Sequence, residues 1–531
     1  MSLSHRLSAL AADRLKGIRR GIEKESLRAL PSGALALTPH PAALGSPLTH
    51  PHITTDYSES QLELITGVHT SVEDCLAELT RIHQYTYRVL QEAGEERLWV
   101  GSMPCGLPTD ETIPLGRYGS SNVARAKSVY RMGLGHRYGR RMQTISGIHY
   151  NWSMPGLSNQ EHFALIRNFR RHAFLLLALF GASPAVCSSF VAGREHGLQA
   201  LSEHTLEDPR AAPRASTAPG GETGTPGSGG TLFKPFATSL RMGRLGYQSE
   251  AQSQLAVSYN SLEGYAASLH EALTQPYAPY ESIGVKNLGG EYNQLATTLL
   301  QIENEFYGTI RPKRVIHPGE RPLHALRERG VEYIEVRCMD LDPFEPVGIN
   351  AQTMRFLDVF LLHCLLADSP PDTPDELAEL GRNQHRTAAF GREPGLMLER
   401  NGREVPLADW AAELLDGMAP IAARLDAAHA GADYTQALAH AHRSLAAPET
   451  LPSARALATV RSDFDSSYTA FIRAQSEQTR NRLLALPWPE GQQSAFVAMA
   501  QQSMRERAAI EAADTVDFET YRQNYVSASR L

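Results

Sequence analysis

The sequence predicts an α+β protein with one mixed or antiparallel sheet. Two observations support this prediction. Stretches that alternate in polarity and are rich in β-branched or aromatic residues are short, few and widely separated, and helical segments join them. From about Pro406 onward the chain is rich in alanine, keeps helical spacing and has almost no β-branched runs, so its last part is expected to be helical.

Four stretches carry the strand pattern. They are GIEKESLR at 21–28, LELIT at 62–66, TISGIHYNWSM at 144–154 and GVEYIEVRCMD at 330–340. Because side chains alternate between two faces along a strand, each stretch can point its polar residues one way and its apolar residues the other. We therefore expect these stretches to contribute to one sheet, although helical segments separate them in the sequence.

Three long helices are predicted, at 71–94, 158–181 and 353–368. The first begins with Ser71 followed by Asp74, and the second begins with Ser158 followed by Glu161. A serine followed three residues later by an acidic residue is typical of a helix amino terminus. The third helix, TMRFLDVFLLHCLLAD, is apolar on nearly all sides, so we expect it at the centre of the fold.

Composition excludes several classes of protein. Of the 531 residues, 42% are hydrophobic and 21% charged, which is typical of a globular chain and unlike disordered, collagen-like or membrane-spanning ones. The net charge of −7 argues against a nucleic acid or an anionic membrane as the main partner. Five cysteines without a CxxC pair are too few for a disulfide framework, so we expect a reducing, cytoplasmic location. The amino-terminal residues lack the apolar core of a secretory signal.

One segment differs from the rest in composition. Residues 206–230, LEDPRAAPRASTAPGGETGTPGSGG, consist mainly of Pro, Gly, Ser, Thr and Ala. Such a segment has too little apolar surface to offset the entropy that ordering would cost. We therefore expect a flexible surface loop, and an insertion within one domain fits this as well as a linker between domains.

The strand-like stretches place acidic residues and one histidine where an extended chain points them to a common face. These residues are Glu23 and Glu25 in the first stretch, Glu63 in the second with Asp56 shortly before it, His149 beside Asn151 in the third, and Glu335 with Arg337 in the fourth. Two interpretations remain open. The residues form the solvated face of an antiparallel sheet, which is common, or they converge on a shared site.

A shared site of this composition would suit Mg²⁺ or Mn²⁺, whereas Zn²⁺ favours cysteine and histidine. Four or five carboxylates need divalent cations, because their repulsion and desolvation would otherwise be prohibitive. Arg337 beside Glu335 could offset the charge that develops on a moving phosphate. A metal-assisted phosphoryl-transfer site is therefore one candidate, although the chain has no GxxxxGK[ST] phosphate loop.

A second group of candidate residues is basic and aromatic. FKPFATSLRMGRLGYQS at 233–249 contains Arg241 and Tyr247. QIENEFYGTIRPKR at 301–314 contains Tyr307, Arg311 and Lys313. The RPKR run is either a solvated basic turn or part of a clamp for a triphosphate opposite the metal ions.

Several longer strings, in this order along the chain, carry a resemblance to a known family. They are LKGIRRGIEKESLR, LGSPLTHPHITTDYSESQLELIT, SMPC, YRMGLGHRYGRRMQTISGIHYN, LFGASPAVCSSF, ATSLR, LQIENEFYGTIRPKRV and EYIEVRCMDLDPF. They closely resemble the proteobacterial glutamate–cysteine ligase family over roughly residues 15–370. The remainder is similar to that family only in general character.

The resemblance implies an activity and a fold. In that family, ATP phosphorylates the γ-carboxylate of glutamate and the amine of cysteine attacks the acyl phosphate, giving γ-glutamylcysteine, ADP and phosphate in the first step of glutathione biosynthesis. The fold is similar to that of glutamine synthetase, in which a curved antiparallel sheet forms a metal-lined funnel surrounded by helices. On this basis we expect a catalytic domain at 9–382 with the 206–230 loop inserted, and a helical carboxy-terminal region at 383–531 packed on it.

The resemblance also assigns roles to individual residues. It implies two or three Mg²⁺ ions, with Mn²⁺ as a possible substitute, held by Glu23, Glu25, Asp56, Glu63, His149 and Glu335. It implies catalytic roles for Glu335, for Arg337 on the transferring phosphate and for Arg241 on a substrate carboxylate or phosphate. It implies a cysteine subsite walled by Tyr130, Leu134, Gln143, Tyr247 and Tyr307, for which ordinary core packing is the alternative. It implies contacts of Lys313 and Arg311 with ATP, the co-substrate.

Two other functions remain to be separated from this one. One keeps the fold and the γ-glutamyl phosphate but uses another amine acceptor, which the Tyr247 and Tyr307 wall disfavours. The other is a metal or nucleotide sensor without turnover, which the complete acidic set disfavours. The expected partners are the small molecules glutamate, cysteine and ATP, with no nucleic acid and no membrane, and we expect a monomer.

Overall fold

The centre of the computed structural model, which describes residues 3–201, 230–245, 250–253, 255–317 and 319–531, is a seven-stranded sheet. Its order is β2-β3-β1-β5-β10-β9, with β4 paired to β1 outside this path, and every pairing is antiparallel. The strands are β1 (Arg19–Ala29), β2 (Ile53–Thr55), β3 (Gln61–Ile65), β4 (Arg97–Leu98), β5 (Ile148–Ser153), β9 (Ile310–Lys313) and β10 (Tyr333–Met339). The predicted α+β class with an antiparallel sheet is confirmed.

The four predicted strands are β3, β1, β5 and β10, which are neighbours in the middle of the sheet. All four differ somewhat in their boundaries, and the largest difference is at β5, which begins at Ile148 and not at Thr144. Residues Met142–Thr144 form a 3-10 turn in which the N–H groups of Gln143 and Thr144 donate to carbonyls three residues earlier. Those N–H groups are therefore not available to a neighbouring strand.

Strand β9 was not predicted as a strand. It contains Pro312, which has no N–H to donate and usually argues against a strand. The structure accommodates the proline because β9 lies at the edge of the sheet and pairs only with β10. Arg311 and Lys313 therefore lie on a strand, and the interpretation of RPKR as a solvated basic turn is wrong for them.

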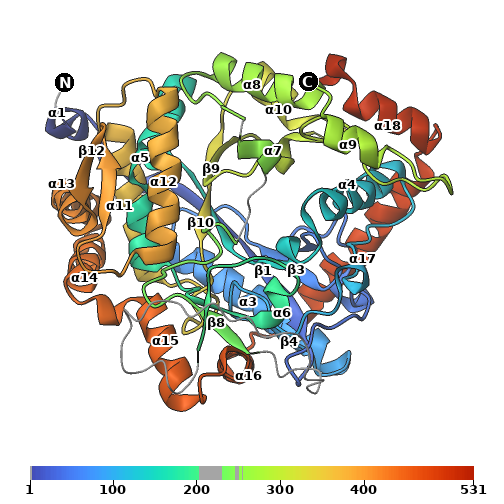
Figure 1. The fold of residues 1–531 in the computed structure, drawn as a ribbon, viewed down its shortest axis with the longest axis horizontal. Coiled ribbons are helices and arrows are strands. Elements are labelled where there is room, and N and C mark those ends of the chain that lie inside the picture. The colour runs from blue at the N-terminus through green and yellow to red at the C-terminus, as the bar shows by residue number, and fades with distance from the viewer. Residues whose placement is uncertain (1–2, 202–229, 246–249, 254, 318) are drawn as a thin grey trace.

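Three helices cover the apolar face of the sheet, namely α3 (Val72–Glu92), α5 (Asn159–Phe180) and α11 (Ala351–Leu366) (Figure 1). They match the three predicted helices. The side chain of Ser71 accepts from the N–H of Asp74, and Ser158 and Glu161 form a reciprocal capping box. Helix α11 contacts both α5 and α3, and its residues from Phe356 to Leu366 are buried, as its apolar sequence predicted.

The carboxy-terminal part is helical apart from the hairpin of β11 (Met397–Arg400) and β12 (Arg403–Pro406). Its helices are α12 (Pro374–Phe390), α13 (Leu407–His429), α14 (Asp433–Ala446), α15 (Pro452–Asp463), α16 (Tyr468–Ala485), α17 (Gln492–Ala512) and α18 (Phe518–Val526). Helix α14 contacts α11 and helix α16 contacts α3, so these two helices pack on the helices that cover the sheet (Figure 1). Helix α12 passes without a break through residue 382, and the division at 382 stays a prediction.

The remaining helices are α1 (Leu3–Ser8), α2 (Ala12–Lys16), α4 (Asn122–Tyr138), α6 (Ser188–Val191), α7 (Glu250–Ser253), α8 (Leu262–Thr274), α9 (Ala278–Ile283) and α10 (Pro322–Arg329). A small sheet joins β6 (Ala185–Cys187), β8 (Thr231–Phe233) and β7 (Gln199–Ala200). The predicted loop at 206–230, except for Gly230, and Tyr247 lie outside the described residues. Among the described helices, none combines the length and the apolar character that a membrane crossing requires.

Candidate active site

The strand register brings the predicted acidic residues side by side on the face of the sheet opposite to the three covering helices. Glu25 of β1 lies directly across from Glu63 of β3, and Glu23 lies across from His149 of β5. Glu335 of β10 lies across from Asn151 of β5 on one side and from Arg311 of β9 on the other. Neighbouring strands therefore contribute adjacent positions to one site.

We call this group of residues the acidic cluster; its members are Glu23, Glu25, Asp56, Glu63, His149 and Glu335. The imidazole of His149 lies within contact distance of three of the carboxylates. The Nδ1 atom of His149 lies 3.2 Å from Glu23 Oε2 and 3.8 Å from Glu335 Oε1, and its Nε2 atom lies 3.6 Å from Glu25 Oε1. The side chains of Glu335, Glu25 and His149 are only 1%, 3% and 5% exposed. The interpretation of these residues as a solvated sheet face is therefore wrong.

Three cationic side chains surround Glu335. Its Oε2 atom lies 3.0 Å from Arg337 Nη1 and 4.0 Å from Arg311 Nη1, and its Oε1 atom lies 3.2 Å from Lys313 Nζ. Burial opposes ionisation of Glu335, but Lys313 and Arg337 hold its pKa well below the usual range. Glu335 is therefore a carboxylate at neutral pH, and the cations beside it mark where an anionic group could bind.

The other half of the cluster is crowded with negative charge. Burial and the neighbouring Asp56 raise the pKa of Glu25 to about 8. Burial, Glu23 and Asp56 raise the pKa of Glu63 well above its usual value. Burial and repulsion both disfavour the ionised carboxylates here, and a bound cation would oppose both effects, because opposite charge favours the ionised form.

The donor atoms fit a hard divalent cation. One carboxylate oxygen each of Glu23 and Glu335 and a ring nitrogen of His149 all lie within 4.8 Å of one another. A set dominated by carboxylate oxygens with one imidazole suits Mg²⁺ or Mn²⁺ better than Zn²⁺. Glu25, Glu63 and Asp56 lie next to this set. Their carboxylates could therefore be ligands of a further ion.

Asn151 also belongs to the site. It shares a strand face with His149, but no role was predicted for it. Its Nδ2 atom donates to Glu23 Oε1 at 2.9 Å, which holds that carboxylate in place. Its Oδ1 atom is buried without a hydrogen-bond partner in the structure. A buried, unpaired amide oxygen beside two carboxylates is a further potential ligand atom. The alternation of β5 could have identified it, since Asn151 and His149 share a face.

Arg241 lies next to the acidic cluster but comes from a segment outside the strands of the central sheet. Its Nη2 atom donates to the main-chain oxygen of Arg337 at 2.8 Å, and its side chain is 2% exposed. Its guanidinium lies against Gly147, whose N–H donates to Glu25 Oε2 at 2.8 Å. Its positive charge opposes the rise in the pKa of Glu25. The structure thus brings Arg241 together with the predicted metal ligands.

Part of the predicted cysteine wall also assembles here. The Nε2 atom of Gln143 donates to the hydroxyl of Tyr307 at 2.9 Å, and the rings of Tyr307 and Tyr138 lie edge to face with centroids 5.6 Å apart. Tyr130 and Leu134 lie one turn apart on α4. Burial raises the pKa of the Tyr307 phenol, and the nearby charges of Glu305 and Asp56 add to that rise.

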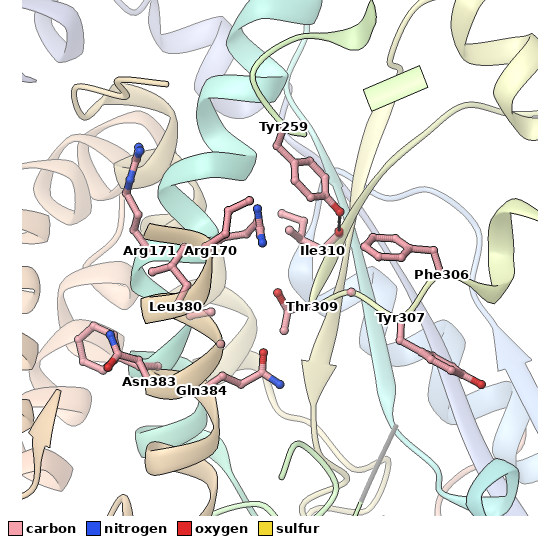
Figure 2. Close-up of a pocket in the computed structure, with 15 residues that line it drawn as sticks. Arg170, Arg171, Tyr259, Phe306, Tyr307, Thr309, Ile310, Leu380, Asn383 and Gln384 are labelled. Carbon is pink, nitrogen blue, oxygen red and sulfur yellow. Dashed lines mark hydrogen bonds between the residues drawn. The ribbon is translucent and has the colours of Figure 1, made fainter. Parts of the chain in front are cut away.

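Figure 2 shows a small cavity of about 140 Å³ behind this wall, between α5, α12 and the segment that leads into β9. Thr309 and Gln384 line it, whereas the ring of Tyr307 extends away from it. The segment from Phe306 to Ile310 therefore separates the cavity from the side of the sheet where Gln143 holds the Tyr307 hydroxyl.

Two larger cavities open beside the cluster. One, of about 390 Å³, is lined by Glu23 and Asn151 and by apolar side chains that include Met154 and Leu157. The other, of about 310 Å³, extends from Lys313 and Arg311 between α8 and α10. Each could hold part of a ligand whose charged end reaches the cluster.

Comparison with known proteins agrees with this geometry. The sequence profile of the family described as glutamate-cysteine ligase matches residues 5–387. A glutamate–cysteine ligase of Alcanivorax borkumensis is 46% identical over 98% of this chain and 97% of its own length, and one of Azotobacter vinelandii is 46% identical over 96% and 94%. The crystal structure of a glutamate–cysteine ligase from Francisella tularensis in complex with AMP is 34% identical, with a TM-score of 0.86 over 97% of this chain and 98% of that one.

A more distant structure, a bifunctional glutathione synthetase from Pasteurella multocida, is 22% identical with a TM-score of 0.61 over 100% of this chain and 58% of that chain, and shows the same fold. The family profile and the named relatives, together with the fold shared with the Francisella tularensis enzyme, place the chain among ligases. The chain belongs to the glutamate–cysteine ligase family.

Proposed function

We propose that this protein joins L-glutamate to the amino group of L-cysteine in an ATP-dependent reaction that passes through γ-glutamyl phosphate. The products are γ-glutamylcysteine, ADP and phosphate, as in the first step of glutathione biosynthesis. The observation that carries the proposal is the convergence of Glu23, His149 and Glu335 beside the cations Arg337 and Lys313. Family membership supports the same substrates.

The acidic face of the sheet would line a metal-binding funnel. Glu23, Glu25, Asp56, Glu63, His149 and Glu335 would hold two or three Mg²⁺ ions, or Mn²⁺ in their place. When bound, such ions neutralise the phosphates of ATP and polarise the bond to the leaving ADP. The hard donor set and the raised pKa values of Glu25 and Glu63 support this assignment.

The basic residues would position the reacting groups. Burial opposes the charge of Arg337, but Glu335 and Glu25 raise its pKa, so its guanidinium stays charged and can steady the transferring phosphate. Lys313 and Arg311 would bind the phosphates of ATP, and Arg241 a carboxylate or phosphate of the substrate. Holding glutamate, cysteine and ATP in line would supply much of the acceleration. No covalent enzyme intermediate is required.

The nucleotide base would enter the cavity that begins at Lys313. Its walls include the apolar side chains of Leu269, Leu323 and Leu326 and the ring of Tyr265. A flat heterocycle is bound by such surfaces, while the triphosphate reaches the cations of β9. This placement keeps the base on one side of the acidic cluster and the Tyr307 wall on the other.

Replacing Tyr307 by Phe is expected to raise the KM for cysteine about tenfold, because the hydroxyl that Gln143 holds at 2.9 Å is lost from the amine subsite. The maximal rate should change less. Steady-state kinetics at saturating glutamate and ATP measure both quantities. Tyr292→Phe is the matched control, since its hydroxyl donates to Glu519 of α18, a residue to which the proposed reaction assigns no role. An unchanged KM in Tyr307→Phe would remove Tyr307 from the subsite.

ADP release with a panel of amines tests the acceptor directly. With purified protein, Mg²⁺, glutamate and ATP, we expect fast ADP release with cysteine and slow release with alanine, serine or ammonia. Equal rates with all amines would favour the alternative ligase with another acceptor. No ADP release with any amine would favour the sensor that binds metal or nucleotide without turnover.

The proposal also covers the cellular location, the oligomeric state and the domain organisation of the protein. We place it in the cytoplasm, because all five cysteines are buried thiols, which suits a reducing compartment. We propose a monomer, because one chain supplies all the site residues described above, and small molecules as its partners. The catalytic domain would comprise 9–382 and the packed helical region 383–531.

A further inference from the structure

Asp340, at the end of β10, is a buried carboxylate to which the proposed reaction assigns no role. Its side chain is 0% exposed. Its Oδ2 atom accepts from the N–H of Ala182 at 2.9 Å and from the hydroxyl of Ser183 at 2.7 Å. Its Oδ1 atom accepts from the hydroxyl of Ser239 at 3.1 Å. A buried carboxylate with three donors is firmly fixed, because any shift would leave polar groups unpaired.

The donors to Asp340 come from two segments that also pair with each other. The N–H of Ser183 donates to the carbonyl of Thr238 at 3.2 Å, and the N–H of Leu240 donates to the carbonyl of Ser183 at 2.7 Å. A Cβ at Gly181 would lie 2.7 Å from the carbonyl oxygen of Thr238, so the close approach requires glycine there. Asp340 thus joins the end of β10, the turn after α5 and the segment that ends at Arg241.

The atom of Asp340 that Ser239 holds also faces Arg241. The distance from Asp340 Oδ1 to Arg241 Nη1 is 3.8 Å, and both side chains are at most 2% exposed. On its other side the guanidinium donates to the main-chain oxygen of Arg337 and lies against Gly147. The guanidinium is therefore held between a fixed anion and the backbone of two strands that carry His149, Glu335 and Arg337.

We propose that Asp340 is a positioning residue that holds the guanidinium of Arg241 at the substrate-facing side of the acidic cluster. The inference rests on the proposed function, in which Arg241 binds a substrate carboxylate or phosphate. Asp340 itself does not touch substrate. Its charge fixes Arg241 in advance of binding, so that the substrate does not have to order a long cationic side chain.

Gly147 explains why this placement matters to the cluster. A Cβ at residue 147 would lie 2.1 Å from Arg241 Nη2, so the guanidinium occupies the space that a side chain would take. The N–H of the same glycine donates to Glu25 Oε2 at 2.8 Å. Arg241 and Glu25 are thus positioned by one residue, and a displaced guanidinium would lose its place next to a proposed metal ligand.

Asp340→Asn keeps the shape of the side chain and removes its charge. We expect kcat/KM for glutamate to fall by on the order of 10²-fold, with the circular dichroism spectrum unchanged. In an Arg241→Ala background, the same Asp340→Asn change should cause little further loss, because its effect acts through the guanidinium. Added guanidinium ion should restore part of the activity of Arg241→Ala but not that of the double variant.

The outcomes separate the inference from the proposed function. Equal losses from Asp340→Asn with and without the Arg241 side chain, or equal rescue of the single and double variants, would overturn the inference while the ligase activity stands. Full activity of Arg241→Ala would overturn the role of Arg241 in the proposed function itself. Asp342→Asn is the matched control, since Asp342 Oδ1 accepts from the N–H of Phe344 at 3.0 Å, and it should keep its activity.

If Asp340→Asn does not fold, Ser239→Ala serves in its place. It removes one of the three donors to Asp340 and the one nearest to Arg241. We expect a smaller loss of kcat/KM for glutamate that again disappears in the Arg241→Ala background. Persistence of that loss without the Arg241 guanidinium would contradict the inference.

Discussion

Glu335→Gln is expected to abolish ADP release, lowering the rate by about 10³-fold or more, while the fold survives. The carboxylate of Glu335 is a proposed metal ligand and is also the shared partner of Arg337, Lys313 and Arg311. Its replacement by a neutral amide leaves three cations with one anion fewer. The proposed metal ions would then lose a ligand, and the cations proposed to contact the phosphate would lose the anion that positions them. Coupled-enzyme detection of ADP measures the rate, and circular dichroism checks the fold.

Glu328→Gln is the matched control for this change. Glu328 is an exposed residue of α10, and the same substitution there should leave ADP release unchanged. Isothermal titration with Mn²⁺ adds a second measurement, because Glu335→Gln should weaken or abolish binding of the ion. Normal turnover in Glu335→Gln would remove this residue from the site, and with it the central contact of the proposed mechanism.

The second large effect is on stability in the absence of divalent ions. Burial and Asp56 raise the pKa of Glu25 to about 8 in the folded protein. A carboxyl whose pKa rises on folding stabilises the protein fully below its unfolded pKa, and that contribution is lost as the pH rises through the folded pKa. In EDTA, the free energy of unfolding should therefore fall from about pH 4.5 to about pH 8.

Glu25→Gln should remove much of this fall, because the amide carries no charge while its oxygen can still accept from the N–H of Gly147. At about pH 8 in EDTA we expect the variant to be more stable than the unmodified protein by on the order of 2 kcal/mol. Mg²⁺ should reverse the order, since ligand binding stabilises the folded state of the protein that keeps its carboxylates. Urea unfolding with and without Mg²⁺ measures both effects.

A flat dependence of stability on pH in EDTA would show that folding does not raise the pKa of Glu25. No stabilisation by Mg²⁺ would count against the metal assignment. His40→Asn is a useful reference variant, because burial lowers the pKa of His40 to about 3 and the residue stays neutral over this range.

Much of the central sheet could be predicted from local pattern. Strands β3, β5 and β10 alternate in polarity because one face is covered by helices and the other carries the acidic cluster, whereas Lys24 and Ser26 interrupt the alternation of β1. The period of two therefore identifies both the strand and its functional face. Edge strand β9 was missed, because its burial and its pairing depend on β10, which lies further along the chain.

The residues around the site divide in the same way. Glu23, Glu25, His149 and Glu335 are titratable residues at alternating strand positions, so the pattern points to them directly. Asp340 and Gly147 have no such signal, because their importance lies in contacts with Arg241 from a distant segment. Asn151 shares the alternation of His149, but only its unpaired buried oxygen distinguishes it from an ordinary strand residue.

The sequence by itself determined four strands of the central sheet, the three long helices, the family and the acidic residues that share a strand face, because alternation and capping depend on neighbours in the chain. Only the tertiary structure decided that those faces meet, since the order of β3, β1, β5, β10 and β9 places segments from Arg19 to Met339 side by side. Burial, together with neighbouring carboxylates, raises the pKa of Glu25 and of Glu63, whereas Lys313 and Arg337 outweigh burial and lower the pKa of Glu335. Burial and neighbouring charges are both created by folding, and so no local pattern contains these shifts.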